Sequence, residues 1–253
     1  MTDRFAGKTA LVTGAGTGIG RSVARAFARH GAAVVVAGRS AEPLTRTVTL
    51  IEGDGGRGTA ITADITRSAD VAQLVQRTTA TYGGLDIAVN NAGTITAFGP
   101  IGDIDENEWA ELLAANLTGT LLAMKHEIAQ MRRNGGGVIV NVSSTLGAHK
   151  RLSGLGAYVT TKAAVSALTR NAALDHIREG IRINAVSPGP ADTPMSYRPG
   201  EDRADRDARI RQQLPAGRVA NLDEIAAAVL YLASPEAAFV VGTDLVVDGG
   251  AAA

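Results

Sequence analysis

Short apolar runs alternate with longer segments of helical period along the whole chain. Thr9 to Thr13 predicts a buried strand, and Ile19 to His30 predicts a helix that ends at Gly31. Further strands are predicted at 33–37, 59–63, 85–90, 138–142, 181–186 and 245–247, and further helices at 42–52, 68–82, 105–131, 157–178 and 222–233. Asp105 is the expected N-cap of the helix at 105–131, and Gly180 is the expected stop of the helix at 157–178.

This alternation predicts the fold class. The predicted strands are apolar throughout, which is typical of parallel strands covered by helices on both faces. Seven such strands favour an α/β fold with an open, doubly wound parallel sheet. No shift in composition divides the chain, so residues 1–253 are expected to form one domain.

One segment departs from the pattern. Residues 188–215 are rich in Pro, Gly, Arg and Asp and show little apolar periodicity before Ile210. The segment leaves the carboxyl end of a predicted strand, which is where open α/β sheets bind ligands. We therefore interpret it as a substrate lid; the alternative is an inert, solvated insertion.

Composition narrows the range of partners. Hydrophobic residues make up 45% of the chain, and 25 Lys and Arg balance 25 Asp and Glu. With this balance, the chain as a whole has no net charge that would attract nucleic acid or a charged membrane surface. There is no cysteine, so disulfides, thiolate catalysis and cysteine-based metal sites are excluded, and no metal is expected. Residues 1–5 form no apolar signal core and no apolar run approaches ~18 residues, so a cytoplasmic location is expected.

A glycine-rich turn lies between the first predicted strand and the first predicted helix. Its glycines are Gly14, Gly16, Gly18 and Gly20. Glycines at such a position let the backbone approach a pyrophosphate, whose charge the helix N-terminus stabilises. The spacing differs from the standard Gly-x-Gly-x-x-Gly fingerprint, and the alternative is a tight turn that binds nothing.

A second candidate is the pair Tyr158 and Lys162, which lie four residues apart on one helix face. A phenol near its usual pKa of ~10 holds its proton too tightly for exchange at neutral pH. A neighbouring ammonium is expected to lower that pKa and to make Tyr158 a useful acid and base. Taken by its spacing alone, the pair is more often an exposed helical contact without chemistry.

These motifs together resemble the short-chain dehydrogenase/reductase family, whose fold is Rossmann-type. Thr13 to Gly20 matches its Thr-Gly-x-x-x-Gly-x-Gly turn, and Asn90 to Gly93 matches its Asn-Asn-Ala-Gly signature. Tyr158 to Lys162 matches its Tyr-x-x-x-Lys motif, and Val247 to Gly250 matches its C-terminal Val-Asp-Gly-Gly. The resemblance covers nearly the full length of the chain.

The resemblance implies four catalytic residues. Tyr158 would be the acid/base, and Ser144, rather than Ser143, would hydrogen-bond the substrate oxygen. Lys162 would hold the nicotinamide ribose, and Asn116 would help to hold a water that links Lys162 to solvent. The interval from Ser144 to Tyr158 is 14 residues, one more than the commonest family spacing, which puts the shape of the loop at 147–155 in doubt.

The resemblance also implies a nicotinamide dinucleotide as cofactor. Gly38 stands where an NAD-binding member usually has an acid, and Arg39 follows it, which favours NADP(H) because guanidinium grips a 2′-phosphate. Thr17, where NADP-binding members often carry a second basic residue, argues the other way, and NAD(H) is the alternative. The expected contacts are Gly14, Gly16, Thr17, Gly18, Ile19, Gly20, Arg39, Asp64, Ile65, Asn91, Ala92, Gly93, Tyr158, Lys162, Pro188, Gly189 and Thr193.

The implied reaction interconverts a small-molecule carbonyl and a secondary alcohol. The leading named possibility within the family is a 3-oxoacyl carrier-protein reductase. Ile95, Phe98 and the segments 148–155 and 190–197 are the expected pocket walls. Within the first of these segments, His149 and Arg151 either meet a polar substrate group or belong to a solvated loop. The alternative function is a nicotinamide-binding sensor or scaffold without catalysis.

Family members commonly form homotetramers by pairing the long fourth and fifth helices. The alanine-rich stretch at 157–173 would permit close approach of two such helices. A homotetramer, or else a dimer, is therefore expected.

Overall fold

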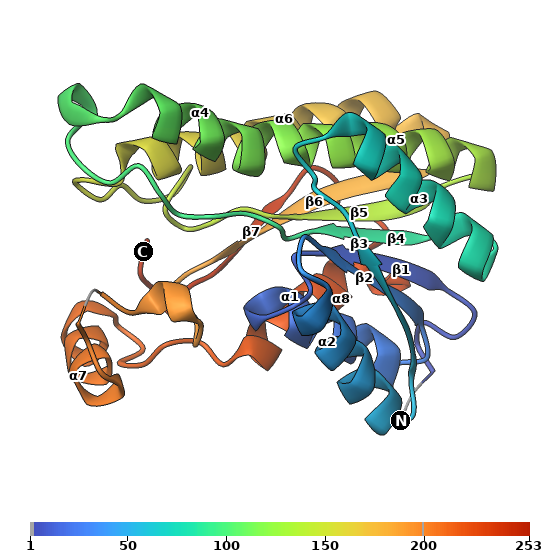
Figure 1. The fold of residues 1–253 in the computed structure, drawn as a ribbon, viewed down its shortest axis with the longest axis horizontal. Coiled ribbons are helices and arrows are strands. Elements are labelled where there is room, and N and C mark those ends of the chain that lie inside the picture. Colours follow the sequence, from blue (N-terminus) through green and yellow to red (C-terminus); the bar gives the residue numbers. More distant parts are fainter. Residues whose placement is uncertain (1–2, 199) are drawn as a thin grey trace.

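The computed structural model describes residues 3–198 and 200–253, and the predicted lid at 188–215 therefore includes one residue, 199, outside them. A parallel sheet runs through the centre of the molecule, with strand order β3-β2-β1-β4-β5-β6-β7 (Figure 1). The strands are β1 (Thr9–Thr13), β2 (Ala33–Gly38), β3 (Arg57–Thr62), β4 (Ile87–Asn90), β5 (Gly137–Val142), β6 (Ile181–Pro188) and β7 (Asp244–Val247). This confirms the predicted doubly wound, Rossmann-type sheet.

Helices cover both faces of the sheet (Figure 1). On one face lie α3 (Ser68–Tyr82), α4 (Glu106–Leu113), α5 (Gly119–Asn134) and α6 (Gly156–His176). On the other face lie α1 (Gly18–Arg29), α2 (Ala41–Gly53) and α8 (Leu222–Ala233). A further helix, α7 (Arg203–Gln213), stands apart at one end of the sheet, close to the C-terminus.

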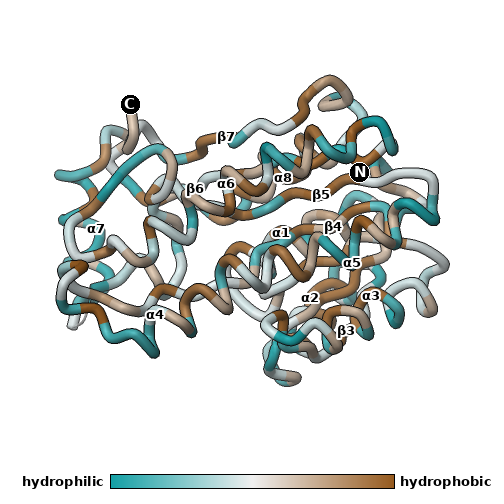
Figure 2. Tube along the Cα trace, turned by 90° about the horizontal axis from the view of Figure 1, so that it is seen from above, coloured by the Kyte–Doolittle hydropathy of each residue, from teal (hydrophilic) through white to brown (hydrophobic). Residues whose placement is uncertain are grey.

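Two apolar cores hold these layers together. Val23 and Phe27 of α1 pack with Val229 of α8 against one side of the sheet, and Leu74 of α3 packs with Met131 of α5 against the other. Figure 2 shows the hydrophobic residues gathered on the central strands and their covering helices, whereas α7 is largely hydrophilic. Within the described residues, no helix is both long enough and apolar enough to cross a lipid bilayer.

The structure differs from the sequence-based expectation in two elements. The predicted helix at 105–131 begins at its expected N-cap Asp105 but is interrupted by a π-helical turn at Ala114–Thr118. The segment at 188–215 contains the regular helix α7, whose first turn is capped by Asp202 and Asp205. No helix was predicted in this segment, because it shows little apolar periodicity before Ile210.

The order of the strands indicates where on the sheet a ligand is expected to bind. The chain winds outward from β1 to β3 and then returns to pair β4 with the other side of β1. The loops that follow β1 and β4 consequently leave the carboxyl edge of the sheet in opposite directions. Open α/β sheets bind their ligands at such a reversal point.

Candidate active site

The glycine turn after β1 is built for close approach of the backbone. Gly14 has φ +64, and a Cβ on it would lie 2.8 Å from Ala92 Cα. A Cβ on Gly20 would lie 2.4 Å from the Gly14 carbonyl oxygen, which no side chain tolerates. Thr17, the N-cap residue of α1, makes no side-chain capping bond. The first N–H groups of α1 are therefore left to bind an anion such as a pyrophosphate.

The segment after β4 fixes this turn in place. Asn91 Nδ2 donates to the carbonyl oxygens of Thr13 (3.1 Å) and Gly14 (3.2 Å). The amides of Asn91 and Ala92 both donate to Thr13 Oγ1, at 3.1 and 3.2 Å. The two signatures that were predicted to belong to one site are thus directly bonded to each other.

Asn116 lies inside the π-helical turn that separates α4 from α5. Its Oδ1 accepts from the amide of Thr94 (2.8 Å), and its Nδ2 donates to the Thr94 carbonyl (2.9 Å) and to Thr161 Oγ1 (3.1 Å). A Cβ on Gly93 would lie 3.1 Å from Asn116 Oδ1 and 3.6 Å from Lys162 Nζ. Gly93 therefore lies beside both the amide oxygen of Asn116 and the ammonium of Lys162. Single π-turns inside helices frequently mark functional sites.

The two serines after β5 point in different directions. Ser143 is buried, with its Oγ 2.9 Å from the carbonyl oxygen of Lys162 on α6. Ser144 is half-buried, accepts from the amide of Leu146 (3.1 Å) and interacts with the Tyr158 hydroxyl. This geometry supports Ser144, rather than Ser143, as the serine of the site.

Tyr158 is buried at the start of α6 among Ala97, Leu112 and Ala157. Burial raises the pKa of its phenol, while the hydrogen bond with Ser144 acts to lower it. Lys162 Nζ lies 5.9 Å from the centre of the Tyr158 ring.

The ammonium of Lys162 is directed elsewhere: it donates to the Val142 carbonyl (2.9 Å). Burial lowers the pKa of Lys162 to about 8. The expectation that Lys162 lowers the Tyr158 pKa is therefore not met in this structure, where burial raises that pKa and the group acting against it is Ser144.

The segment after β6 lies against the glycine turn. A Cβ on Gly18, which has φ +52, would lie 3.2 Å from Thr193 Cγ2. The amide of Gly189 donates to the Val247 carbonyl (3.0 Å), and a Cβ there would lie 2.7 Å from Asp248 Cα. Pro188 is the last residue of β6. Thr193 thus faces the start of α1 across the space above the sheet edge.

The residues predicted to hold the other end of the dinucleotide lie beyond β2 and β3. Arg39 is exposed at the end of β2, and its charge helps to lower the pKa of Asp64, although the hydrogen bonds from Thr66 contribute most. Ile65 packs over Gly119, where a Cβ would lie 2.6 Å from Ile65 Cδ1. Ile19 lies in the first turn of α1.

A fully buried arginine, which the sequence pattern did not single out, ties α7 to the segment after β6. Arg206 is 1% exposed; its Nη1 donates to Asp192 Oδ1 (2.6 Å), and its Nη2 donates to Asp207 Oδ1 (2.8 Å). Its guanidinium lies 4.5 Å from the centre of the Tyr197 ring. The signal available in the sequence was the group of Arg and Asp residues at 203–207, which resembled a solvated surface.

Large apolar side chains are exposed on the loops after β4, β5 and β6. They are Phe98, Ile101, Leu152, Met195 and Tyr197. The first two loops lie side by side, since the amide of Gly99 donates to the Gly154 carbonyl (2.9 Å). We call these five residues the apolar rim.

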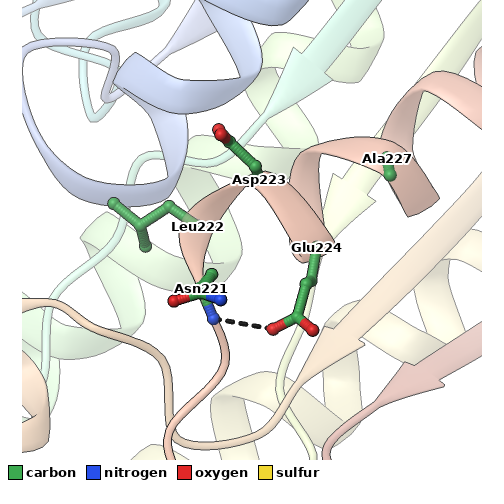
Figure 3. Close-up of a pocket in the computed structure, with 5 residues that line it drawn as sticks. All are labelled: Asn221, Leu222, Asp223, Glu224 and Ala227. Atoms are coloured by element: carbon green, nitrogen blue, oxygen red, sulfur yellow. Dashed lines mark hydrogen bonds between the residues drawn. The ribbon is translucent and has the colours of Figure 1, made fainter.

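A separate hollow lies at the N-terminus of α8 (Figure 3). Its lining residues are Asn221, Leu222, Asp223, Glu224 and Ala227, none of which belongs to the predicted site. Glu224 accepts from the Asn221 amide in a capping box, and Asp223 accepts from Ser22 of α1, so these groups serve local structure. Among the described residues, no cluster of His, Asp and Glu suits a metal ion.

Comparison with known proteins gives the family. Residues 14–252 match a family model described as enoyl-(acyl carrier protein) reductase. The chain is 42% identical to a cis-4-hydroxycyclohexanecarboxylate dehydrogenase of Sinomonas cyclohexanicum, over 99% of this chain and 98% of that protein.

Solved structures agree over the whole fold. A levodione reductase superposes with a TM-score of 0.93 at 32% identity, covering 98% of each chain. A 7α-hydroxysteroid dehydrogenase in complex with NADH and 7-oxo glycochenodeoxycholic acid superposes with a TM-score of 0.90 at 33% identity, covering 98% of this chain and 96% of that one. With these relatives and the bonded signatures above, the chain belongs to the short-chain dehydrogenase/reductase family, as an NAD(P)-dependent oxidoreductase acting on CH–OH groups.

Proposed function

We propose that this enzyme uses NADP(H) to interconvert ketones and secondary alcohols carried on apolar rings, with Asn116, Ser144, Tyr158 and Lys162 as its catalytic residues. The observation that carries the proposal is their connection in space. Ser144 interacts with Tyr158, and Asn116 and Lys162 both lie beside Gly93. The glycine turn, which has no room for side chains at Gly14 and Gly20, fits a dinucleotide pyrophosphate.

The protein's part of the reaction is proton transfer and alignment. When bound, the nicotinamide would supply the hydride that adds to the carbonyl carbon, or accept it in the reverse direction. In carbonyl reduction, Tyr158 gives its phenolic proton to the carbonyl oxygen, while the Ser144 hydroxyl donates a hydrogen bond to that oxygen. In alcohol oxidation, the Tyr158 phenolate takes the hydroxyl proton.

Lys162 and Asn116 act behind Tyr158. Lys162 would hold the nicotinamide ribose, and its pKa of about 8 lets its amine exchange a proton near neutral pH. Asn116 is held by Thr94 and Thr161 beside Gly93 and Lys162, where its role would be to hold a water that connects Lys162 to solvent. Thr193 and Gly189 would lie at the nicotinamide end of the site.

We also propose NADP(H) over NAD(H). Arg39 is exposed at the end of β2, and Gly38 before it offers no carboxylate to the ribose hydroxyls. The related 7α-hydroxysteroid dehydrogenase was solved with NADH, which makes NAD(H) the alternative. Ratios of kcat/KM for the two dinucleotides decide between them, and a preference for NADH would overturn this choice.

The apolar rim supports the substrate class. Phe98 and Ile101 are 64% and 67% exposed, and exposed apolar groups of this size mark binding surfaces. Two relatives are named for hydroxycyclohexane and hydroxysteroid substrates, which are ring-borne alcohols. An acyl carrier protein is an acidic partner, and the rim offers it apolar rather than basic contacts.

Residues 1–253 are proposed as one domain, with 188–215 as the substrate lid and a homotetramer as the assembly. The helices α5 and α6 would pair between subunits. A single species of monomer mass in light scattering would contradict the assembly.

The test is a screen of cyclic secondary alcohols and ketones, 3-oxoacyl thioesters and sugars. Each compound is tried with both dinucleotides, and turnover is measured by the change in nicotinamide absorbance. Turnover of ring alcohols with NADP+ is the expected result. A clear preference for 3-oxoacyl thioesters would replace the proposed substrate class. Tight dinucleotide binding without turnover on any compound would favour a sensor or scaffold.

A further inference from the structure

The loop at 143–155, which carries Ser144, is anchored by a histidine. His149 lies in this loop, and its Nε2 is 3.0 Å from Asp244 Oδ2 at the start of β7. The histidine ring therefore faces the sheet, and His149 is not free to meet a substrate group. A second tie runs from Lys150 Nζ to the Ala251 carbonyl (2.6 Å).

Asp244 is the centre of a buried hydrogen-bond network. Its side chain is 2% exposed, and it accepts from Ser187 Oγ of β6 and Ser166 Oγ of α6, both at 2.6 Å. A carboxylate only accepts hydrogen bonds, so both serine hydroxyls and the His149 ring must donate to it. One carboxylate thus joins the loop, α6, β6 and β7.

The network continues to the catalytic positions. Ser166 gives its one proton to Asp244, so the single proton of Ser143 goes either to Ser166 Oγ (3.0 Å) or to the main-chain carbonyl of Lys162 (2.9 Å). Ser143 is the residue before Ser144, and Ser166 is one helical turn beyond Lys162. A shift of His149 would therefore displace both the loop that carries Ser144 and the helix that carries Tyr158.

The arrangement is not a hydrolytic triad. A triad needs the imidazole between the serine and the carboxylate, so that the ring can take the serine proton. Here Asp244 lies between His149 and the serines, and His149 makes no hydrogen bond with a serine hydroxyl in the part of the chain that the structure describes. The role open to the group is positional.

We infer that His149 and Asp244 form a positioning pair, which holds the loop at 143–155 against α6 so that Ser144 stays in contact with Tyr158. The inference rests on the proposed function, in which Ser144 and Tyr158 act on one substrate oxygen. Misplacement of a catalytic group by about 1 Å costs up to ~10²-fold in rate. The pair acts through Ser144 and does not touch the reacting atoms.

The test compares His149→Leu, which removes the donor, with His149→Gln, whose amide can still donate to Asp244. We expect His149→Leu to lower kcat about tenfold and to leave the Kd for the dinucleotide within about twofold of wild type. We expect His149→Gln to recover most of the lost kcat. The Tyr158 titration midpoint, measured by absorbance against the matching Tyr158→Phe protein, should rise in His149→Leu because the Ser144 hydrogen bond is weakened.

His176→Leu is the matched control, since His176 pairs with Glu179 (3.1 Å) at the other end of α6. It should leave kcat and the Tyr158 midpoint unchanged. The inference is overturned if both His149 variants keep wild-type kcat and midpoint, or if Leu and Gln lower kcat equally and shift the midpoint equally. If wild type turns over no compound, the proposed function fails, and the Tyr158 midpoints alone then decide the inference.

Discussion

At the scale of single residues, the site depends on what burial does to two titratable groups. Burial raises the pKa of the Tyr158 phenol and lowers that of the Lys162 amine to about 8. Both shifts favour the neutral form, because a charge is costly away from water. The phenol therefore holds its proton more tightly than a free tyrosine does. Its transfer to substrate must be driven by the negative charge that develops on the carbonyl oxygen as the hydride arrives.

The first prediction concerns Tyr158→Phe. The substitution removes the hydroxyl that exchanges the proton and keeps the ring that packs against Ala97 and Leu112. We expect kcat to fall roughly 10²–10⁴-fold, with dinucleotide binding retained. Steady-state kinetics and fluorescence titration of the dinucleotide measure the two effects. Turnover equal to that of wild type would exclude Tyr158 as the acid/base.

The second prediction concerns Gly20→Ala in the glycine turn. The new Cβ would lie 2.4 Å from the Gly14 carbonyl oxygen and 2.5 Å from Asn91 Nδ2, so the turn must shift. Dinucleotide Kd should rise at least about tenfold, a cost of roughly 1.4 kcal/mol. Gly53→Ala, at the end of α2, is the control because nothing lies within 4 Å of its Cβ. Equal affinity in the two variants would argue against pyrophosphate binding at this turn.

At the scale of elements, the sequence predicts most of the fold because the spacing of apolar residues reflects which side chains are buried in each helix and strand. The predicted strand at Thr9–Thr13 and the predicted helices at Ser68–Tyr82 and Leu222–Ala233 match the structure at both ends. The remaining boundaries shift by a few residues, where helix ends and strand ends are set by local hydrogen bonds.

The two features that the sequence pattern missed have a common physical reason. No residue type marks the π-turn at Ala114–Thr118, and the side chain of Asn116 within it is held by Thr94 and Thr161, which are 22 and 45 residues away in sequence. Helix α7 lacks an apolar stripe, and one of its two buried residues is Arg206, an arginine held by Asp192 and Asp207. Tertiary ion pairs leave no periodic signal in a sequence.

Some residues of the candidate site could be predicted from the sequence and others could not. The catalytic and glycine motifs could be predicted, because each lies at the end of one strand or on one helix. The role of Asp244 could not be predicted from local sequence, because its partners are 57 to 95 residues away; they are Ser166, Ser187 and His149. Only the folded sheet brings them together.

The third prediction concerns the lid and its arginine. Asp192→Asn weakens the partner of a buried guanidinium, so α7 should dock less firmly on the segment that carries Thr193. We expect KM for substrate and dinucleotide to rise several-fold, up to about tenfold, and protease cleavage within 200–215 to accelerate. Glu179→Gln, which breaks an exposed pair with Arg132, is the control. Unchanged cleavage and KM in Asp192→Asn would show that the pair does not hold the lid.

At the scale of the whole molecule, a polar network lies buried between the sheet and α5. Glu127 Oε2 accepts from Asn90 Nδ2 (2.9 Å), which also donates to Asn141 Oδ1 (3.0 Å), and Asn141 Nδ2 donates to Thr169 Oγ1 (2.9 Å). Glu127 is 1% exposed, and burial raises its pKa from 4.5 to about 7. This carboxyl links the stability of the fold to pH.

The fourth prediction follows from the sign of that shift. A group whose folded pKa is raised stabilises the fold below its unfolded pKa, and this contribution is lost as the pH rises from 4.5 through about 7. The difference between the two values corresponds to ~3 kcal/mol, so Glu127→Gln should change the unfolding free energy little near pH 5 and raise it by up to that amount at pH 8. Urea unfolding at both pH values, with Glu108→Gln on the surface of α4 as control, measures it. A gain that is the same at both pH values would mean that Glu127 does not titrate within the fold, and that the buried network acts through packing alone.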